Sequence, residues 1–387
     1  MQLKVTHLIR AFLPPATSFV RNQIMYHQRY MPSVVYTEKR ESELFTEISD
    51  EFSTQQLNTR GIGKLFCERF LILLPGDNIR LCKFLKNYNP NILHVHYGVE
   101  AILFSKLIRT SGIPALVSFY GHDCTAFPKK FGGFGAKMLK SCVFDNPGVK
   151  MITAMSSDME NDLLKLGCPP GKIRIHYHGS DTGRFVMKRE YTQKNPIRLL
   201  IISLFDQKKG HHFLIDAFDL ASRKSSQQMV LEIVGEGPLR NEIRNHILKI
   251  GSKNIILSGP VRYQSQEHLN LLREADIFVH PSITPPNGNK EGIPGAIMEA
   301  MASGLPVIAT RHAGIPVVIT HNETGLLIPE NDVEALSDAI IQLAEDVNLR
   351  KKIGNNGKIL TQSTLDVHVK EAELEKLYDE IIQSRSF

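Results

Sequence analysis

The fold is decided by Asp276-Ile-Phe-Val-His-Pro-Ser, which leads through a polar loop to Glu291-Gly-Ile-Pro-Gly-Ala-Ile-Met-Glu-Ala-Met-Ala-Ser-Gly-Leu-Pro. The first part is a short apolar run that predicts a buried strand, and the second predicts a helix over 295–303. Pro294 suits the first helical turn, and Gly304 suits the position just beyond the helix end. A strand, a loop and a helix in this order form the repeating unit of an α/β sheet.

The same alternation extends along the rest of the chain. Short apolar runs predict strands, and the amphipathic stretches between them predict helices. The strand candidates are 3–9, 33–37, 91–97, 114–119, 149–155 and 172–177 in the first half, and 197–203, 230–234, 254–258, 276–280, 306–309 and 325–328 in the second. The helix candidates are 18–30, 100–110, 158–166, 211–223, 238–249, 266–274, 295–303, 333–345, 349–360 and 365–383. Strands that are apolar throughout and alternate with helices indicate parallel sheets covered on both faces.

The length of 387 residues predicts two domains, because a single hydrophobic core stops growing near ~250–300 residues. A polar linker at 185–196 separates the two halves. We therefore expect one doubly wound α/β domain over 1–187 and a second over 188–364. A final helix within 365–387 is expected to pack back on the first domain. Because ligands of open α/β sheets bind beyond the carboxyl ends of the strands, the expected site is a cleft between two facing sheets.

Two glutamates flank the start of the predicted 295–303 helix. Glu291 precedes this helix and Glu299 lies within it. The free N–H groups at a helix start attract a phosphate, and carboxylates accept hydrogen bonds from sugar or ribose hydroxyls. For an arbitrary pair of glutamates, exposure to solvent is the better explanation. The hypothesis of a sugar-phosphate site therefore depends on the rest of the pattern.

Short motifs rich in glycine, histidine and acidic residues occur along nearly the whole chain. The first half contains His94-Val-His-Tyr-Gly, Ser118-Phe-Tyr-Gly-His-Asp, Met155-Ser-Ser-Asp and His178-Gly-Ser-Asp followed by Phe185. The second half contains Lys208-Lys-Gly, Val234-Gly-Glu-Gly-Pro and the Glu291/Glu299 pair. In this order they resemble the retaining glycosyltransferases of family 4, which have the GT-B fold of two Rossmann-like domains. Phe12-Leu-Pro and Thr17-Ser-Phe-Val resemble, more loosely, the branch that builds capsules and exopolysaccharides.

The resemblance implies a hexosyl- or N-acetylhexosaminyl-transferase. Such an enzyme moves a sugar from a nucleoside-diphosphate sugar to a glycan or lipid-linked acceptor and keeps the anomeric configuration. It also implies catalytic roles for Lys209 at the departing diphosphate, for Glu291 at the donor sugar, and for Asp123, which would face the sugar and acceptor. Glu299 would hold the ribose. The other residues implied are Gly292, Ile293, Gly235, Val261 and Arg262 for donor binding, and Tyr120, His122 and His178 on the acceptor or sugar side.

The chain departs from the family pattern at three positions. Leu204 stands where the family usually has an arginine beside the diphosphate, Tyr120 where it often has a histidine, and Val317 where a glutamate is frequent. An inactive nucleotide-sugar-binding subunit is therefore one alternative, and a sugar-nucleotide epimerase or a phosphorylase on the same fold is another. No Asp-x-Asp pair occurs, so charge on the leaving diphosphate would be stabilised by lysine and helix N–H groups. We expect no metal and no other cofactor.

Histidines and cysteines give no clear metal site. His94 and His96 share one strand face, but no nearby carboxylate or cysteine completes a ligand set, so hydrogen-bonded histidines are the preferred interpretation. The cysteines are Cys67, Cys82, Cys124, Cys142 and Cys168. Their spacing predicts neither zinc nor disulfides and fits a reducing cytosol. The sequence also shows no signal peptide, and its densest apolar run, 70–74, is far shorter than the ~20 residues of a spanning helix. We expect a cytoplasmic protein.

Positive charge is concentrated in the first half. Residues 1–184 carry 23 Lys and Arg against 15 Asp and Glu, whereas 185–387 carry 23 against 25. Two basic regions contain Arg60, Lys64, Arg69, Arg80, Lys83 and Lys86, and Lys129, Lys130, Lys137 and Lys140 interleaved with Phe127, Phe131 and Phe134. They fit solvated helix faces, or docking on an anionic membrane at ~1 kcal/mol per cation, which would place the protein on the inner face. Nucleic acid is disfavoured, because no nucleic-acid-binding motif accompanies the charge.

Overall fold

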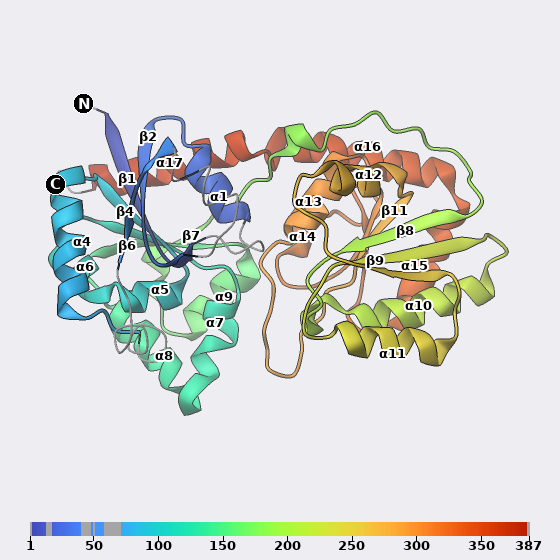
Figure 1. Ribbon diagram of the computed structural model, residues 1–387, viewed down its shortest axis with the longest axis horizontal. Helices are drawn as coiled ribbons and strands as arrows, with labels where there is room; N and C mark the ends of the chain where they lie inside the picture. The colour runs from blue at the N-terminus through green and yellow to red at the C-terminus, as the bar shows by residue number, and fades with distance from the viewer. Residues whose placement is uncertain (1, 13–17, 40–47, 49–50, 58–70, 385–387) are drawn as a thin grey trace. The chain divides into compact units, whose positions relative to one another are not determined.

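The computed structural model describes residues 2–12, 18–39, 48, 51–57 and 71–384 (Figure 1). Some residues named from the sequence lie outside the described ranges. They are Cys67, then Leu13, Pro14 and Thr17 of the two loosely matching motifs, and Arg60, Lys64 and Arg69 of the first basic region. The chain divides into two compact units, of which the first comprises 1–179 with 367–387 and the second comprises 180–366. In each unit helices cover both faces of a parallel sheet (Figure 1).

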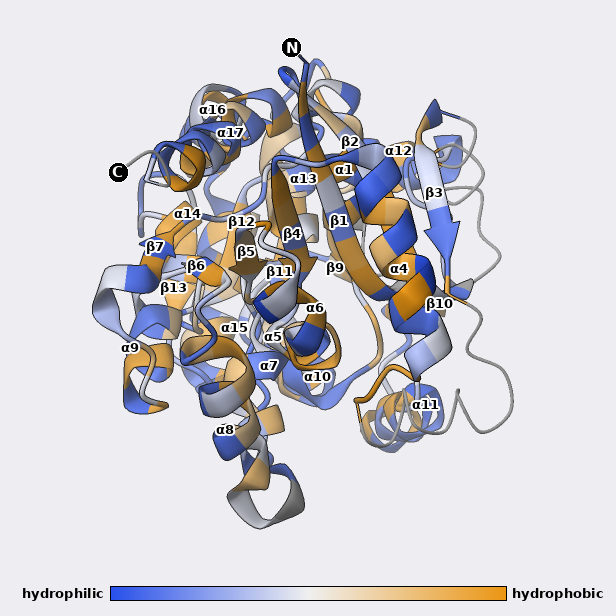
Figure 2. Ribbon diagram, turned by 90° about the vertical axis from the view of Figure 1, so that its left-hand side faces the viewer, coloured by the Kyte–Doolittle hydropathy of each residue, from blue (hydrophilic) through white to orange (hydrophobic). Residues whose placement is uncertain are grey.

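The sheet of the first unit has seven parallel strands in the order β3-β2-β1-β4-β5-β6-β7. They are β1 (Leu3–Phe12), β2 (Tyr30–Lys39), β3 (Ser53–Gln56), β4 (Ile92–His96), β5 (Ala115–Ser118), β6 (Val149–Ala154) and β7 (Ile173–Ile175). Every strand predicted for this half is confirmed. The pattern missed β3, whose sequence Ser-Thr-Gln-Gln is polar and half-exposed because it forms the sheet edge, drawn from near-white to blue in Figure 2.

The helices of the first unit differ more from the prediction. They are α1 (Ser18–Met25), α4 (Pro75–Tyr88), α5 (Gly98–Leu103), α6 (Ser105–Thr110), α7 (His122–Thr125), α8 (Phe134–Leu139), α9 (Ser157–Lys165) and α17 (Val367–Gln383). The helix predicted over 18–30 ends at Met25, because Tyr30 begins β2 and is buried there. The helix predicted over 100–110 is interrupted at Phe104, and α4 was not predicted.

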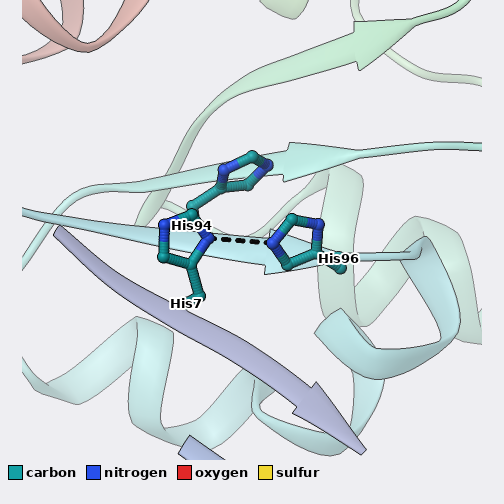
Figure 3. A group of neighbouring side chains, drawn as sticks. All are labelled: His7, His94 and His96. Carbon is teal, nitrogen blue, oxygen red and sulfur yellow. Dashed lines mark hydrogen bonds between the residues drawn. The ribbon is translucent and has the colours of Figure 1, made fainter. Parts of the chain in front are cut away.

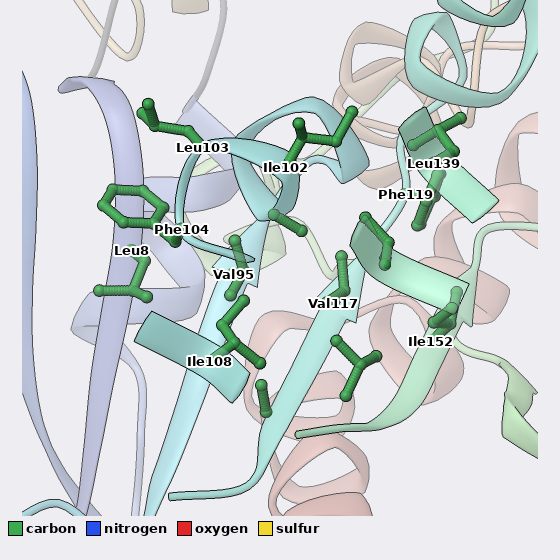
Figure 4. Packing of buried hydrophobic residues seen from close by; sticks show 14 of the residues in the cluster. Leu8, Val95, Ile102, Leu103, Phe104, Ile108, Val117, Phe119, Leu139 and Ile152 are labelled. Carbon is green, nitrogen blue, oxygen red and sulfur yellow. The ribbon is translucent and has the colours of Figure 1, made fainter. Parts of the chain in front are cut away.

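Both faces of the first sheet are packed with apolar side chains. One face carries Leu8, Val95 and Val117 against residues of α5 and α6 (Figure 4). The opposite face packs against α17 through a second cluster. Its members are Val5, Tyr30, Ile92, Leu116, Met151, Leu374, Tyr378 and Ile381. Because side chains alternate along a strand, a sheet covered on both sides needs strands that are largely apolar, and this sequence supplies them. The buried His7, His94 and His96 are exceptions.

The second unit repeats the design with six parallel strands in the order β10-β9-β8-β11-β12-β13. They are β8 (Ile197–Ile202), β9 (Met229–Val234), β10 (Ile255–Ser258), β11 (Ile277–His280), β12 (Val307–Thr310) and β13 (Leu326–Ile328). The helices are α10 (His211–Lys224), α11 (Arg240–Ile250), α12 (Gln266–Glu274), α13 (Gly295–Ala302), α14 (Ile315–Val318), α15 (Val333–Glu345) and α16 (Val347–Thr364). All the strands and helices predicted for this unit are confirmed to within a few residues.

Helix starts in the second unit fall into two classes. The side chains of Ser265, Asp332 and Asp346 accept an N–H of the first turn of α12, α15 and α16, which satisfies a free donor and holds the helix start. The starts of α10, α11, α13 and α14 have no side-chain cap. In α13, which follows Pro294, the N–H of Ile297 donates to the Pro294 carbonyl, and the preceding N–H groups of the first turn have no intrahelical acceptor and can bind a ligand. Among the described residues, no helix is both long and apolar enough to cross a membrane.

Candidate functional site

The predicted donor residues of the second unit lie at the carboxyl ends of its strands. Lys209 is in the turn between β8 and α10, and Glu291 is in the loop between β11 and α13. The backbone holds these two segments together, because the N–H of Ile283 donates to the carbonyl of Lys208 at 2.9 Å. Gly210, at φ 67°, lies so close to Pro281 that a Cβ would stand 2.1 Å from its carbonyl oxygen. A side chain at residue 210 would therefore separate the two segments.

Lys209 and Glu291 form a nearly buried ion pair. The Lys209 Nζ lies 2.7 Å from Oε1 and 2.8 Å from Oε2 of Glu291. Burial by itself raises the pKa of Glu291, but the positive charges of Lys209 and Lys208 outweigh it, and the pKa falls to about 2. Burial lowers the pKa of Lys209, and the Glu291 charge opposes that shift. The pair thus fixes a cation at the edge of the sheet where ligands of this fold class bind.

Glu299 is a buried carboxyl without such a partner. It lies one turn into α13 on the side of Gly295, where a Cβ would stand 3.5 Å from the Glu299 Oε1. Burial raises the pKa of Glu299 to about 8. The neighbouring cation candidate is His268, whose Nε2 is 3.6 Å from Oε2 and whose own pKa burial lowers to about 4. Hydroxyl donors from a ligand would stabilise the ionised carboxylate at this position.

Glu299 is expected to make stability depend on pH. A carboxyl whose pKa rises from 4.5 to about 8 on folding holds its proton in the folded state. Its contribution is therefore most favourable at low pH and is lost as the pH rises from about 4.5 through 8. Between pH 5 and pH 8.5, the free energy of unfolding of wild type should therefore fall by about 2–5 kcal/mol more than that of the variant Glu299→Gln.

Urea unfolding at the two pH values measures this difference. Glu274→Gln on α12 is the matched control, because Glu274 is exposed and pairs with Arg198 at the surface. An equal pH dependence in wild type and Glu299→Gln would contradict the prediction.

The turn after β9 is shaped by two glycines. Cβ atoms on Gly235 and Gly237 would stand 2.0 Å and 2.6 Å from the carbonyl oxygens of Ser203 and Phe205. The Gly-x-Gly pattern therefore permits two backbone segments to lie against each other after β8 and β9. Leu204 lies in this turn between Ser203 and Phe205, and its side chain has an exposed fraction of 49%. Val261 and Arg262, the other donor-binding candidates, lie in the loop after β10.

In the first unit, Asp123 organises its own turn. Its Oδ1 accepts the N–H groups of Tyr120 and Gly121 at 3.1 and 3.0 Å, and its Oδ2 accepts that of Gly98 at 2.9 Å. Burial raises the pKa of this carboxyl to about 6, although the backbone donors lower it. Both oxygens are directed at backbone amides. The proposed role of Asp123 toward a sugar or acceptor stays a prediction.

The three acceptor-side candidates have different surroundings. Tyr120 and His178 both pack on Phe19, each with a ring-centre distance of 4.7 Å. The hydroxyl of Tyr120 is 2.8 Å from His96 Nδ1 and donates to the Oε1 of Gln23 at 2.9 Å. His122 begins α7 and is exposed. Tyr120 and His178 therefore lie against the same aromatic residue, Phe19. Phe19 belongs to the Thr17-Ser-Phe-Val motif.

A cluster of buried histidines contacts the hydroxyl of Tyr120 through His96. His7, His94 and His96 bring ring nitrogens within 4.8 Å of one another (Figure 3). Each of their ring nitrogens has a hydrogen-bond partner, from His27, Ser118, Tyr378 or Tyr120 or within the cluster. Burial lowers the pKa of His96 to about 3 and that of His7 well below its usual value. Neutral rings could bind a metal, but here they form a complete hydrogen-bond network.

Sequence reasoning missed polar residues at the ends of β11, β12 and β13. His280 ends β11 and is buried, and neither of its ring nitrogens has a hydrogen-bond partner among the described residues. His312 and Glu330, which follow β12 and β13, contact each other. Their positions directly after apolar strands were the available signal, because those strand ends converge on one edge of a parallel sheet.

Family models and relatives agree with this arrangement. Residues 27–184 match the model described as Glycosyltransferase Family 4, and residues 184–359 match the one described as Glycosyl transferases group 1. The amylovoran biosynthesis glycosyltransferase AmsK of Erwinia amylovora is 30% identical over 291 residues, which cover 73% of this chain and 68% of AmsK. The chain belongs to glycosyltransferase family 4. Both units of this family 4 glycosyltransferase are matched, so the assignment does not depend on the donor motif alone.

Other relatives match a shorter part of this chain, and solved structures match it at lower sequence identity. The putative colanic acid biosynthesis glycosyltransferase WcaL of Salmonella typhimurium is 36% identical over 185 residues, which cover 47% of this chain and 44% of WcaL. Among solved structures, HepE of Anabaena in complex with UDP and glucose has a TM-score of 0.78 at 17% identity and covers 98% of this chain and 100% of that one. Sucrose-phosphate synthase of Thermosynechococcus elongatus also has a TM-score of 0.78 at 17% identity, with 99% and 100% covered. These likenesses confirm the GT-B fold.

Proposed function

We propose that this glycosyltransferase moves a hexosyl or N-acetylhexosaminyl group from a nucleoside-diphosphate sugar to a glycan or lipid-linked acceptor, with retention of configuration. The observation that carries the proposal is the Lys209–Glu291 ion pair, at 2.7 Å, together with the uncapped start of α13 and the buried Glu299 within it. A cation, free N–H groups and two carboxylates are the groups that recognise a diphosphate, a sugar and a ribose.

In the proposed reaction, the bond between the sugar C1 and the diphosphate oxygen breaks, and its electron pair leaves with the diphosphate. The acceptor oxygen forms a bond to C1 on the same face, and its proton passes to a departing phosphate oxygen. Lys209 and the N–H groups of Gly292 and Ile293 stabilise the negative charge that develops. Glu291 orients the sugar hydroxyls and Glu299 those of the ribose. We propose no role for a metal or other cofactor.

The names of the relatives support a role in polysaccharide biosynthesis. AmsK and WcaL are named for the biosynthesis of amylovoran and colanic acid, and HepE was crystallised with UDP-glucose. We therefore propose a role in building a cell-surface polysaccharide from a nucleotide sugar in the cytoplasm. A position on the inner membrane face is part of this proposal. Lys129, Lys130 and Lys137 are exposed near Phe134, which has an exposed fraction of 56%, whereas Phe127 is buried.

A donor screen tests the function directly. The purified protein is incubated with UDP-glucose, UDP-galactose, UDP-N-acetylglucosamine, GDP-mannose and ADP-glucose, and release of nucleoside diphosphate is measured. We expect wild type to release nucleoside diphosphate from one class of donor. We expect the variant Glu299→Ala to release much less of it. Binding without release would instead support the inactive subunit that Leu204 suggests, and an epimerised nucleotide sugar would support the epimerase. Release that is unchanged in Glu299→Ala would contradict the assignment of this site.

A further inference from the structure

One carboxylate–imidazole pair holds both ends of the loop that leads to Glu291. At the first end, Glu330 accepts the N–H of Thr284 at 2.6 Å and its hydroxyl at 3.2 Å. At the other end, the N–H of Glu291 donates to the Nε2 of His312 at 3.1 Å. The Nδ1 of His312 lies 2.7 Å from Glu330. The loop over 284–291 is therefore anchored twice to the same two side chains.

The hydrogen bonds determine where the proton of His312 lies. An Nε2 that accepts an N–H carries no proton, so the ring proton is on Nδ1 and points at Glu330. The His312 side chain is fully buried, whereas the Glu330 side chain is 24% exposed. Hydrogen bonds from His312 and from the Thr284 N–H lower the pKa of Glu330, although burial raises it. The Nδ1–H of His312 donates to Glu330, and the Thr284 hydroxyl, which also lies 3.4 Å from Nδ1, donates to Glu330. This network holds both ends of the loop.

The parallel sheet explains how these residues meet. His312 follows β12 and Glu330 follows β13, and the two strands are hydrogen-bonded neighbours that end at the same edge. The backbone also approaches closely here, because a Cβ on Gly314 would stand 2.6 Å from the carbonyl oxygen of Gly292. Packing against the ends of β12 and β13 therefore holds the segment that carries Glu291, Gly292 and Ile293.

We propose that His312 and Glu330 are positioning residues that hold Glu291 and the following N–H groups in register with the donor sugar. This inference rests on the proposed function. In Glu291, His312 accepts the backbone N–H, so it acts by fixing where the Glu291 carboxylate and the Gly292 amide lie. A misplacement of about 1 Å at a reacting centre can lower a rate about 10²-fold. The ribose side of the site, at Glu299, has no contact with this pair and is expected to be unaffected.

The test compares His312→Phe with His312→Gln. Phenylalanine fills the space without accepting a hydrogen bond, whereas the Oε1 of glutamine can accept the Glu291 N–H. We expect His312→Phe to lower kcat for donor cleavage by about 10–100-fold, with a smaller loss in His312→Gln. Because the Gly292 and Ile293 amides also face the diphosphate in the proposed reaction, the Kd of the free nucleoside diphosphate, measured by calorimetry with UDP, GDP and ADP, should rise, but by a smaller factor than kcat falls. Hydrogen exchange of a peptide over 284–294 should become faster in His312→Phe.

A matched control and the exchange readout separate this proposal from the proposed function. His321 also accepts a backbone N–H, from Leu327 at 3.0 Å, but lies outside the proposed site, so His321→Gln should leave kcat and loop exchange unchanged. Exchange over 284–294 that stays at the wild-type rate in His312→Phe would overturn the positioning role, whether or not any donor is cleaved. If wild type cleaves no donor but the loop exchanges faster in His312→Phe, the anchoring is supported and the proposed function is contradicted.

Discussion

Replacing Lys209 with methionine is expected to lower kcat for donor cleavage by about 10²–10³-fold. The fixed ammonium is held next to the diphosphate in the proposed reaction, and removal of one preorganised group that stabilises developing charge typically costs this much. Leu204 supplies no second cation, because it stands where the family usually has an arginine. The loss should therefore appear mainly in kcat, since charge on the leaving diphosphate grows in the transition state. Steady-state release of nucleoside diphosphate from the best donor measures it.

The control for this variant is another lysine of the same unit. Lys224 also pairs with carboxylates, those of Glu334 and Asp338, but on an exposed part of α10. Lys224→Met removes the same charge from the unit and should leave kcat within about twofold, because exposed ion pairs contribute little. A kcat for Lys209→Met close to that of Lys224→Met would contradict the proposed role of Lys209.

The sequence predicted the second unit better than the first for a physical reason. Its strands are short apolar runs, and its helices α12, α15 and α16 begin at Ser265, Asp332 and Asp346, residues whose side chains cap them. Local signals of this kind can be read without knowing the tertiary structure. In the first unit, α4 begins after Leu74 with no side-chain cap, and its buried face, at Asp77, Leu81 and Leu85, carries a carboxyl and only two apolar residues. Its position depends on packing that the local pattern does not show.

The site was predictable in its residue types but not in its contacts. The Glu291/Glu299 spacing and the Lys208-Lys-Gly motif are the residue patterns from which a donor region is proposed. The sequence did not reveal that Lys209 pairs with Glu291, because the two are 82 positions apart. Nor did it reveal that both Asp123 oxygens accept backbone N–H groups. Contacts between strand ends depend on strand order, and a sequence read alone gives the strands without their order.

Glu291→Gln is expected to lower both stability and activity, and the two losses should respond differently to a second substitution. Glutamine leaves the nearly buried ammonium of Lys209 without its counter-charge, and breaking such a pair costs about 3 kcal/mol of the free energy of unfolding. It also removes a pH dependence. Folding depresses the pKa of Glu291 from 4.5 to about 2, so its stabilising contribution is present above pH 4.5 and is lost as the pH falls toward 2. Urea unfolding at pH 7 and pH 3 measures both effects.

The double variant Lys209→Met/Glu291→Gln separates the folding role of the pair from its catalytic role. Removing both charges leaves no unpaired ion, so stability should recover most of what each single change loses, and the interaction energy of the double-mutant cycle should be clearly nonzero. Activity should not recover, because the proposed reaction uses both the Lys209 ammonium at the diphosphate and the Glu291 carboxylate at the sugar. We expect all three variants to remain about 10²-fold or more below wild type. A double variant that regained both stability and kcat would show that the pair serves the fold alone.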